Sequence, residues 1–310
     1  MPAMELSPVP TDHVVQARHV SKSFGEVRVL DDVHFDIRRG EMVGLIGASG
    51  SGKSTLIRAI AGLTPIDRGN GAADACEILL FGRPIQQRGR VARAANALRA
   101  RVGVVFQQFN LVPRLTVLTN VCLGRLGQMP LWQATLGRFS DDAKRRAMRA
   151  LARVGIAEHA LKRGCELSGG QQQRAAIART LMQGAEFIVA DEPIASLDPS
   201  SARRVMDILA DLNRSDNITV LVSLHQVEYA LRYCSRTIAL KHGKIAFDGP
   251  SSALTPELLT ALYGAESEEL FASLHAPKAP HDADRAHADA VVPLDAARRA
   301  QAERRHQAHA

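Results

Sequence analysis

A glycine-rich segment early in the chain constrains the fold more than any other part of the sequence. Residues 47–55 read GASGSGKST, which matches the pattern G-x-x-x-x-G-K-[ST]. The continuous apolar run at 42–47 is typical of a strand buried on both faces, and TLIRAIAGL at 55–63 is typical of a helix. Strand, loop and helix in this order disfavour a flexible Gly/Ser turn and predict a loop that cradles phosphates.

The loop residues have separate expected tasks in holding a nucleoside triphosphate such as ATP. Glycines let the backbone curl so that successive N–H groups point at phosphate oxygens, and the helix N-terminus adds partial positive charge. Lys53 is expected to reach the β- and γ-phosphates, and the Ser54 hydroxyl to bind Mg²⁺. The predicted phosphate-binding residues are Gly47, Ala48, Ser49, Gly50, Ser51, Gly52, Lys53, Ser54 and Thr55.

A second apolar run ends in two carboxylates. Residues 187–192 read FIVADE, so Asp191 and Glu192 follow a strand expected to be buried. Asp191 is placed to hold Mg²⁺, and Glu192 to orient and deprotonate an attacking water. A purely structural pair of surface carboxylates is the alternative. It is the weaker one, because buried strands rarely end in Asp-Glu without a cation to satisfy them.

Strands alternate with helices along most of the chain. Residues 14–40 predict antiparallel strands, 102–106, 187–191 and 218–224 predict buried strands, and 237–249 predict a terminal hairpin. Helices are expected at 89–100 and 200–214 and through most of 115–183. This alternation indicates an α/β domain with a mostly parallel sheet, into which a helical block at about 108–184 is inserted.

Composition excludes several other classes of protein. Hydrophobic residues make up 46% of the 310 residues, too many for wholesale disorder, and the 4% aromatic content argues against a stacking platform for nucleic acid. No apolar run reaches the 18 or so residues that cross a bilayer, and the first 13 residues do not resemble a signal peptide. None of the 4 cysteines forms a CxxC pair, so neither a zinc site nor a disulfide framework is indicated.

Residues 167–171 read LSGGQ, followed by QQRAAIARTLM, and here the sequence resembles the ATP-binding cassette (ABC) ATPases. This pentapeptide is the signature of that family. Ser168 is suited to cap a helix, and the glycines leave its N–H groups open to an anion. The resemblance implies that Ser168, Gly169, Gly170 and Gln171 contact the γ-phosphate of ATP held by a second copy of the chain, so that a dimer shares two sites.

The resemblance covers about residues 14–250 and assigns four further residues. Phe24 looks like the aromatic residue that stacks on adenine, although a lone Phe is more often part of a core. Gln107 resembles the glutamine that touches Mg²⁺ and the water and senses the membrane partner. Asp198 lies in a loop that resembles the link between the two sites of the dimer, and His225 resembles the switch histidine that holds the γ-phosphate.

The family fold implied is a P-loop NTPase (RecA-like) core with an antiparallel β subdomain and an inserted helical subdomain. The ATPase domain is expected at 14–264, with its core at about 14–107 and 185–264 and its helical subdomain at about 108–184. Residues 265–310 are rich in alanine, histidine and arginine, lack a regular apolar period and are expected to form a disordered tail.

Three classes of ABC protein compete: an importer subunit, a soluble translation or DNA-maintenance protein, and a regulatory module that does not turn over. The chain has one glycine-rich phosphate loop (a Walker loop), whereas translation proteins of this family usually carry two cassettes. The spacing from Gly52 to Ser168 is too short for the coiled coil of a DNA-maintenance protein. The presence of Glu192 and His225 argues against a module that does not turn over, so the importer subunit is favoured. The stretches at 106–127, 190–209 and 223–249 resemble phosphonate-import ATPases. Importers of phosphite or of polar amino acids remain alternatives.

An importer subunit of this family implies partners and a location. The expected partners are a second copy of the chain, transmembrane permease subunits that dock around Gln107 and residues 108–130, and, indirectly, a periplasmic phosphonate-binding protein. No specific nucleic acid is expected. The permease subunits would hold the chain at the cytoplasmic face of the bacterial inner membrane.

A basic stretch between Glu77 and Asp141 contains no acidic residue. Either its arginines pair with carboxylates elsewhere in the fold, or they form a face held near anionic lipid headgroups or an acidic partner. The nine arginines are Arg83, Arg88, Arg90, Arg93, Arg99, Arg101, Arg114, Arg125 and Arg138.

Overall fold

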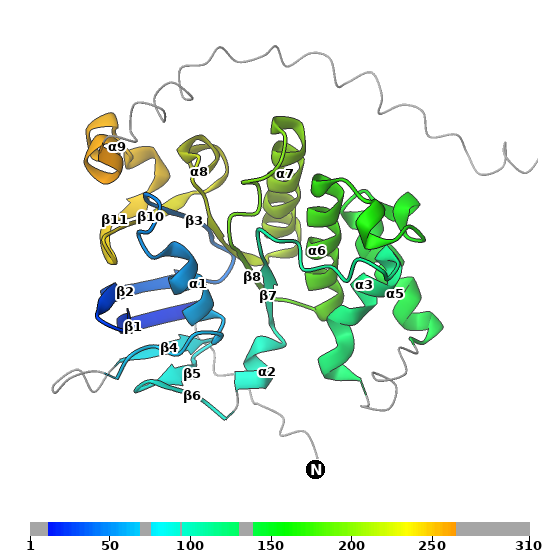
Figure 1. Ribbon diagram of the computed structural model, residues 1–310, viewed down its shortest axis with the longest axis horizontal. Helices are drawn as coiled ribbons and strands as arrows, with labels where there is room; N and C mark the ends of the chain where they lie inside the picture. Colours follow the sequence, from blue (N-terminus) through cyan, green and yellow to red (C-terminus); the bar gives the residue numbers. More distant parts are fainter. Residues whose placement is uncertain (1–11, 69–75, 94, 130–138, 265–310) are drawn as a thin grey trace, which may run out of the picture. The chain divides into compact units, whose positions relative to one another are not determined.

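The computed structural model describes residues 12–68, 76–93, 95–129 and 139–264, all of which belong to one structural unit, residues 1–270. A mostly parallel sheet of six strands holds them together, in the order β11-β10-β3-β9-β8-β7 (Figure 1). Only β11 runs antiparallel to its neighbour. The strands are β3 (Met42–Ile46), β7 (Val102–Val105), β8 (Phe187–Ala190), β9 (Thr219–Ser223), β10 (Arg236–Lys241) and β11 (Lys244–Pro250).

The central strands are buried from end to end. Every residue of β3, β8 and β9 is buried, as expected of parallel strands covered on both faces. Because parallel strands all end at the same edge of the sheet, the segments that follow β3, β7, β8 and β9 converge there. This edge positions the candidate site.

A second sheet of five strands is antiparallel, in the order β2-β1-β4-β5-β6. Its strands are β1 (His13–Phe24), β2 (Val27–Arg38), β4 (Glu77–Leu80), β5 (Arg83–Gln87) and β6 (Arg90–Val91). Helix α1 (Lys53–Ile60) buries Leu56 and Ile60 in a core that also contains Val14, Ile37 and Leu45. This core joins α1 to both sheets, so the helix that follows the glycine-rich loop is held on each side.

The described residues from 117 to 183 are mostly helical, as the sequence predicts. α3, α5 and α6 lie together, and α6 carries the LSGGQ segment at its start (Figure 1). α5 begins after Ser140, whose side chain accepts a hydrogen bond from the Ala143 N–H. The elements are α3 (Val117–Cys122), η1 (Leu123–Gln128), α5 (Asp141–Arg153), η2 (Ala157–His159), η3 (Gly164–Glu166) and α6 (Gly169–Gln183).

The last third of the domain contains α7 (Pro199–Asp216), α8 (Val227–Tyr233), η4 (Ser251–Ala253) and α9 (Pro256–Tyr263). The Tyr233 hydroxyl donates a 2.7 Å hydrogen bond to Asp207 of α7, which ties α8 to α7. Burial and this bond raise the pKa of Tyr233. Tyr229 stacks on Tyr233 with ring centroids 6.1 Å apart. Tyr233 therefore links α8 to α7, and Tyr229 stacks on it within α8.

The prediction of a helix over 89–100 is mostly wrong. Arg90–Val91 forms β6, which pairs with the end of β5, and only α2 (Ala95–Arg99) is helical. The helix expected after the loop forms at Lys53–Ile60, with Ala61 as its C-cap. Pairing with a neighbouring strand overrides the helical preference of a short Ala/Arg-rich segment.

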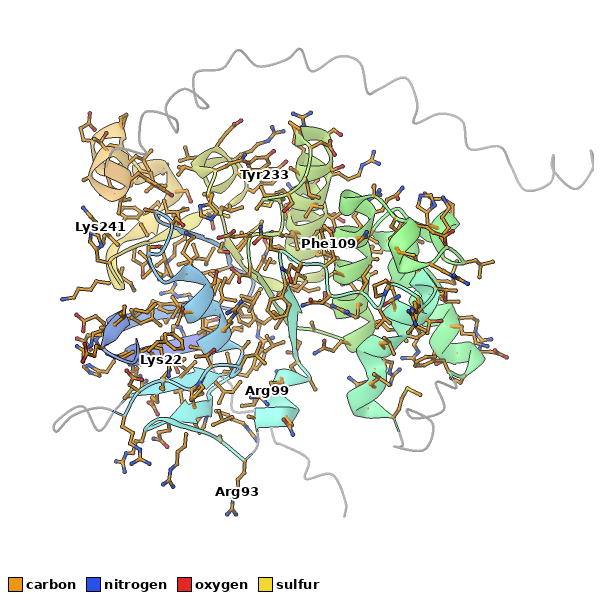
Figure 2. All side chains as sticks on the ribbon, in the orientation of Figure 1. Lys22, Arg93, Arg99, Phe109, Tyr233 and Lys241 are labelled. Carbon is orange, nitrogen blue, oxygen red and sulfur yellow. The ribbon has the colours of Figure 1, made fainter. Side chains whose placement is uncertain are left out.

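The arginines between Glu77 and Asp141 have different surroundings in the fold. Arg101 forms a bidentate pair with Glu186, at 2.6 and 2.8 Å, and lies over the Phe81 ring. Arg99 donates to the carbonyl groups of Ala61 and Gly62. Arg93, by contrast, is exposed and points away from the chain (Figure 2). Arg101 thus supports carboxylate pairing for its own position.

None of the helices among residues 12–68, 76–93, 95–129 and 139–264 is long and apolar enough to cross a membrane. The predicted tail at 265–310 and Arg138 lie outside the described residues. The boundaries expected at 107/108 and 184/185 stay predictions.

Candidate nucleotide site

The glycine-rich loop turns sharply between β3 and α1, and two of its glycines have no room for a side chain. Gly47 has φ 147°, and a Cβ there would lie 2.3 Å from the Leu240 carbonyl oxygen. Gly52 has φ 106°, and its Cβ would lie 2.8 Å from the Val29 carbonyl oxygen. Glycine is therefore required at both ends of the turn. Ser49 and Gly50, between them, are exposed.

Lys53 is the first residue of α1 and curls back over the loop. Its side-chain Nζ donates to the carbonyl oxygens of Gly47, at 2.7 Å, and Ala48, at 3.2 Å. The residue is only 5% exposed. Its charge therefore lies inside the turn, beside the first N–H groups of the helix, and this arrangement suits a bound phosphate.

Ser54 and Asp191 meet although they are 137 residues apart in sequence. The Ser54 hydroxyl donates a 3.0 Å hydrogen bond to Asp191 Oδ1. The hydroxyl of Ser223, at the end of β9, donates to the same oxygen at 3.0 Å and accepts from the Glu192 N–H at 2.8 Å. A hydroxyl beside a carboxylate is the oxygen donor set that Mg²⁺ prefers. The residues present therefore fit a magnesium ion.

Glu192 and His225 form a second pair at the same edge of the sheet. His225 Nε2 lies 2.6 Å from Glu192 Oε1. Glu192 has φ 49°, a left-handed conformation that costs free energy in a residue other than glycine. This conformation places the Glu192 carboxylate against the His225 imidazole. Because Glu192 directly follows Asp191, the two pairs are neighbours.

Gln107 and Phe24 are both exposed. Gln107 follows β7 at the edge where Asp191 follows β8, and its side chain is exposed. Phe24 ends β1 and is 54% exposed, with the Lys22 ammonium 5.1 Å from the centre of its ring. Its exposure excludes the alternative that Phe24 is a core residue and leaves a ring face for stacking. Thr55 lies in α1 and is half-buried.

The LSGGQ segment is organised separately, at the N-terminus of α6. The Ser168 hydroxyl accepts from the Gln171 N–H, and Gln171 Oε1 accepts from the Ser168 N–H. Gln171 Nε2 also lies 2.9 Å from His159 Nε2. A Cβ on Gly170 would lie 2.7 Å from the Ser201 side chain, so this glycine allows α6 to approach α7. Gly169 and exposed Ser168 present the helix start to solvent.

Asp198 caps α7. Its Oδ1 accepts hydrogen bonds from the Ser200 hydroxyl and from the N–H groups of Ser200 and Ser201, at 2.6, 3.0 and 3.0 Å. These bonds, the Ser200 hydroxyl first among them, hold the pKa of the carboxyl well below its usual range. Asp198 therefore stays ionised and fixes the start of α7 beside Gly170.

Two residues of the site do not follow from the sequence reasoning. The Tyr263 hydroxyl, at the end of α9, accepts a 3.1 Å hydrogen bond from the Gly47 N–H. Nothing in the α9 sequence indicates that contact, 216 residues from its partner. Ser223 is a polar residue that ends a buried strand, and the same signal that identified Asp191 and Glu192 would have found it.

Comparisons with known proteins agree with this geometry. The ABC transporter family model matches residues 30–195. The chain is 58% identical to a phosphonates import ATP-binding protein of Stutzerimonas stutzeri, over 81% of this chain and 90% of that one. A second such protein, from Cupriavidus metallidurans, is 52% identical over 92% of this chain and 99% of the relative.

A solved structure of an ATP-binding cassette, dimeric and bound to ADP and Pi, matches with a TM-score of 0.64. Its sequence is 33% identical, and the match covers 77% of this chain and 100% of that one. The fold is therefore that of an ABC ATPase cassette, which binds ATP and ADP. This chain belongs to the ABC transporter family, among the phosphonates import ATP-binding proteins.

Proposed function

We propose that this chain is the ATP-hydrolysing subunit of an ABC importer and energises the uptake of phosphonates. The observation that carries the proposal is the convergence of the Lys53 loop, the Ser54–Asp191 pair and the Glu192–His225 pair at one sheet edge. We call this edge the catalytic edge. The substrate class rests on the 58% identity to a phosphonates import ATP-binding protein.

The residues at this edge have different roles in ATP hydrolysis. Lys53 and the N–H groups of residues 47–55 bind and orient the phosphates, and Phe24 stacks on the adenine. Glu192 takes the proton from the attacking water, and His225, 2.6 Å away, orients this carboxylate and faces the transferred phosphoryl group. Ser54, Asp191 and Gln107 would hold Mg²⁺, which supplies positive charge to the phosphate oxygens.

A second copy of the chain completes each site. At the N-terminus of α6, Ser168 and Gln171 bond to each other and frame Gly169 and Gly170, whose N–H groups suit a γ-phosphate held by the other copy. Asp198 fixes the end of the loop that runs from Glu192 to α7, and the start of α7 lies beside Gly170. Closing the dimer on two ATP molecules and reopening it after hydrolysis is the movement that the subunit supplies.

Permease subunits receive that movement. We place their docking surface at Gln107, which follows β7, and at residues 108–130, the first part of the proposed helical subdomain. This subdomain is proposed to span about 108–184, within an ATPase domain at 14–264. The partners would hold the chain at the cytoplasmic face of the bacterial inner membrane and receive phosphonate from a periplasmic binding protein.

Growth on methylphosphonate as the sole phosphorus source tests the proposal. A strain that lacks the gene should fail on methylphosphonate but grow on phosphate. The wild-type chain should restore growth, and a chain with Glu192→Gln should not. Failure on phosphite or on a polar amino acid, with normal growth on methylphosphonate, would replace the phosphonate assignment with another small polar solute.

A further inference from the structure

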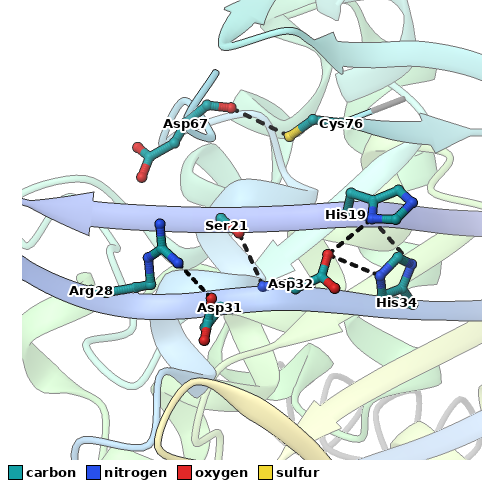
Figure 3. A network of polar contacts seen from close by, with 8 residues as sticks. All are labelled: His19, Ser21, Arg28, Asp31, Asp32, His34, Asp67 and Cys76. Atoms are coloured by element: carbon teal, nitrogen blue, oxygen red, sulfur yellow. Dashed lines mark hydrogen bonds and ion pairs between the residues drawn. The ribbon is translucent and has the colours of Figure 1, made fainter. Parts of the chain in front are cut away.

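Two strands of the antiparallel sheet bring two imidazoles and a carboxylate together, outside the nucleotide site. His19 projects from β1, and Asp32 and His34 project from β2 (Figure 3). His19 Nδ1 lies 2.9 Å from Asp32 Oδ1, and His34 Nε2 lies 3.0 Å from the same oxygen. One ligand atom of each residue lies within 4.8 Å of the other two.

The three side chains are open to ions from solution. The side chains of His19, Asp32 and His34 are 43%, 63% and 44% exposed. The imidazoles meet edge to face, with centroids 4.1 Å apart. The two rings are therefore roughly perpendicular, and one nitrogen of each ring faces the Asp32 carboxylate.

The backbone is distorted where these side chains meet. His19 has φ 49° and Asp32 has φ 53°, both left-handed values that are unfavourable for residues other than glycine. The pairing of β1 with β2 shifts register between Ala17 and Val20. In an undistorted ladder, alternate residues point to opposite faces of the sheet. The distortion on both strands brings the ligand atoms to one point.

We propose that His19, Asp32 and His34 bind a divalent transition-metal ion. Two imidazole nitrogens and one carboxylate oxygen form a donor set that Zn²⁺ and its neighbours accept, with water in the open position. Ligands about 2.0–2.2 Å from one tetrahedral ion stand about 3.4 Å apart. The N···O distances of 2.9 and 3.0 Å need to open by only a few tenths of an ångström.

The bound ion replaces the two hydrogen bonds between the imidazoles and Asp32. In each neutral ring the proton moves to the other nitrogen, and His34 gives up the long 3.4 Å contact between its Nδ1 and the His19 N–H. The hydrogen bond from His19 already lowers the pKa of Asp32, so the carboxylate is ionised. Mg²⁺ prefers oxygen ligands and stays with the nucleotide.

Zn²⁺ competition against a chromophoric chelator tests the site on the full, nucleotide-free chain. We expect His19→Gln and His34→Gln each to weaken one Zn²⁺ equivalent roughly tenfold or more. The matched control is His242→Gln, which removes an exposed histidine with a similar left-handed backbone, φ 48°. The histidines at 265–310 are the same in every variant and cancel in the comparison.

Long-range ¹H–¹⁵N spectra give an independent readout. Zn²⁺ should shift the ring nitrogens of His19 and His34 in the wild-type chain while the amide spectrum of the fold is kept. Because His34 is exposed and contacts the partner strand through its ring, His34→Gln should fold normally. Equal Zn²⁺ affinity and stoichiometry in the wild type and all three variants, with unshifted rings, would overturn the proposal.

Discussion

The catalytic edge and the LSGGQ segment differ in how their polar groups are satisfied. At the edge, side chains from distant parts of the chain bond to one another: Ser54 to Asp191 and His225 to Glu192. In the LSGGQ segment, Ser168 and Gln171 bond to each other across one turn of α6. One chain therefore assembles the groups that act on the phosphate, but presents its signature to solvent as a preformed surface.

The largest expected effect is that of Lys53→Ala on the catalytic edge. Removing the ammonium leaves the phosphates without their central positive charge, so ATP binding or turnover should fall by about 100-fold or more. Fluorescent-nucleotide titration and phosphate release measure the two quantities. Turnover at the wild-type rate in a folded variant would remove Lys53 from the site.

Glu192→Gln separates binding from chemistry within the same edge. The amide keeps the shape but cannot accept the proton of the attacking water, so turnover should fall about 10²–10⁴-fold. Nucleotide affinity should change little, since Glu192 contacts His225 rather than the loop. A variant that hydrolyses ATP at the normal rate would show that Glu192 is not the base.

Ser168→Arg tests the other region, with Ser140→Arg as its matched control. Both serines are exposed N-caps of helices in the same helical segment, so each loss should cost about 1 kcal/mol of stability. Only the change at Ser168 should reduce ATP turnover, by roughly tenfold or more, because we propose that only this helix faces the nucleotide of the other copy. Equal turnover in the two variants would assign LSGGQ a structural part alone.

Tyr263→Phe tests the contact between α9 and the glycine-rich loop, which the Tyr263 hydroxyl makes with the Gly47 N–H. The change leaves the buried Gly47 N–H without its acceptor, which should cost about 1–2 kcal/mol of stability. We expect a weaker affinity for ATP with an unchanged rate at saturation, measured by titration and by the ATPase rate. An affinity equal to that of the wild type would confine Tyr263 to packing.

The smallest effect is expected far from both regions, at the Arg101–Glu186 pair. Arg101 lowers the pKa of Glu186, so the pair stabilises the fold above the carboxyl's unfolded pKa of about 4.3 and loses this as pH falls through the lower folded value. Glu186 is 40% exposed, which limits the contribution to about 1 kcal/mol. Glu186→Gln should therefore destabilise the fold at pH 7 in urea denaturation, and its difference from the wild type should shrink as the pH falls below about 4.

The sequence predicts those parts of the site whose residues lie at the ends of buried strands. The order of strand, glycine loop and helix around Lys53 has few alternatives, and Asp191 and Glu192 follow β8 as expected. Tyr263 was missed because its contact with Gly47 depends on where α9 packs, which no local pattern encodes. The prediction of a helix over 89–100 is mostly wrong because Arg90–Val91 pairs with β5.

The most direct test of the account is whether ATP joins two copies through LSGGQ. In light scattering, the full chain with Glu192→Gln should become a dimer when MgATP is added. The chain with both Glu192→Gln and Ser168→Arg should bind ATP equally well and remain a monomer. If the double variant dimerises as readily as the single one, the two regions do not meet across the nucleotide, and the proposed division of the site is wrong.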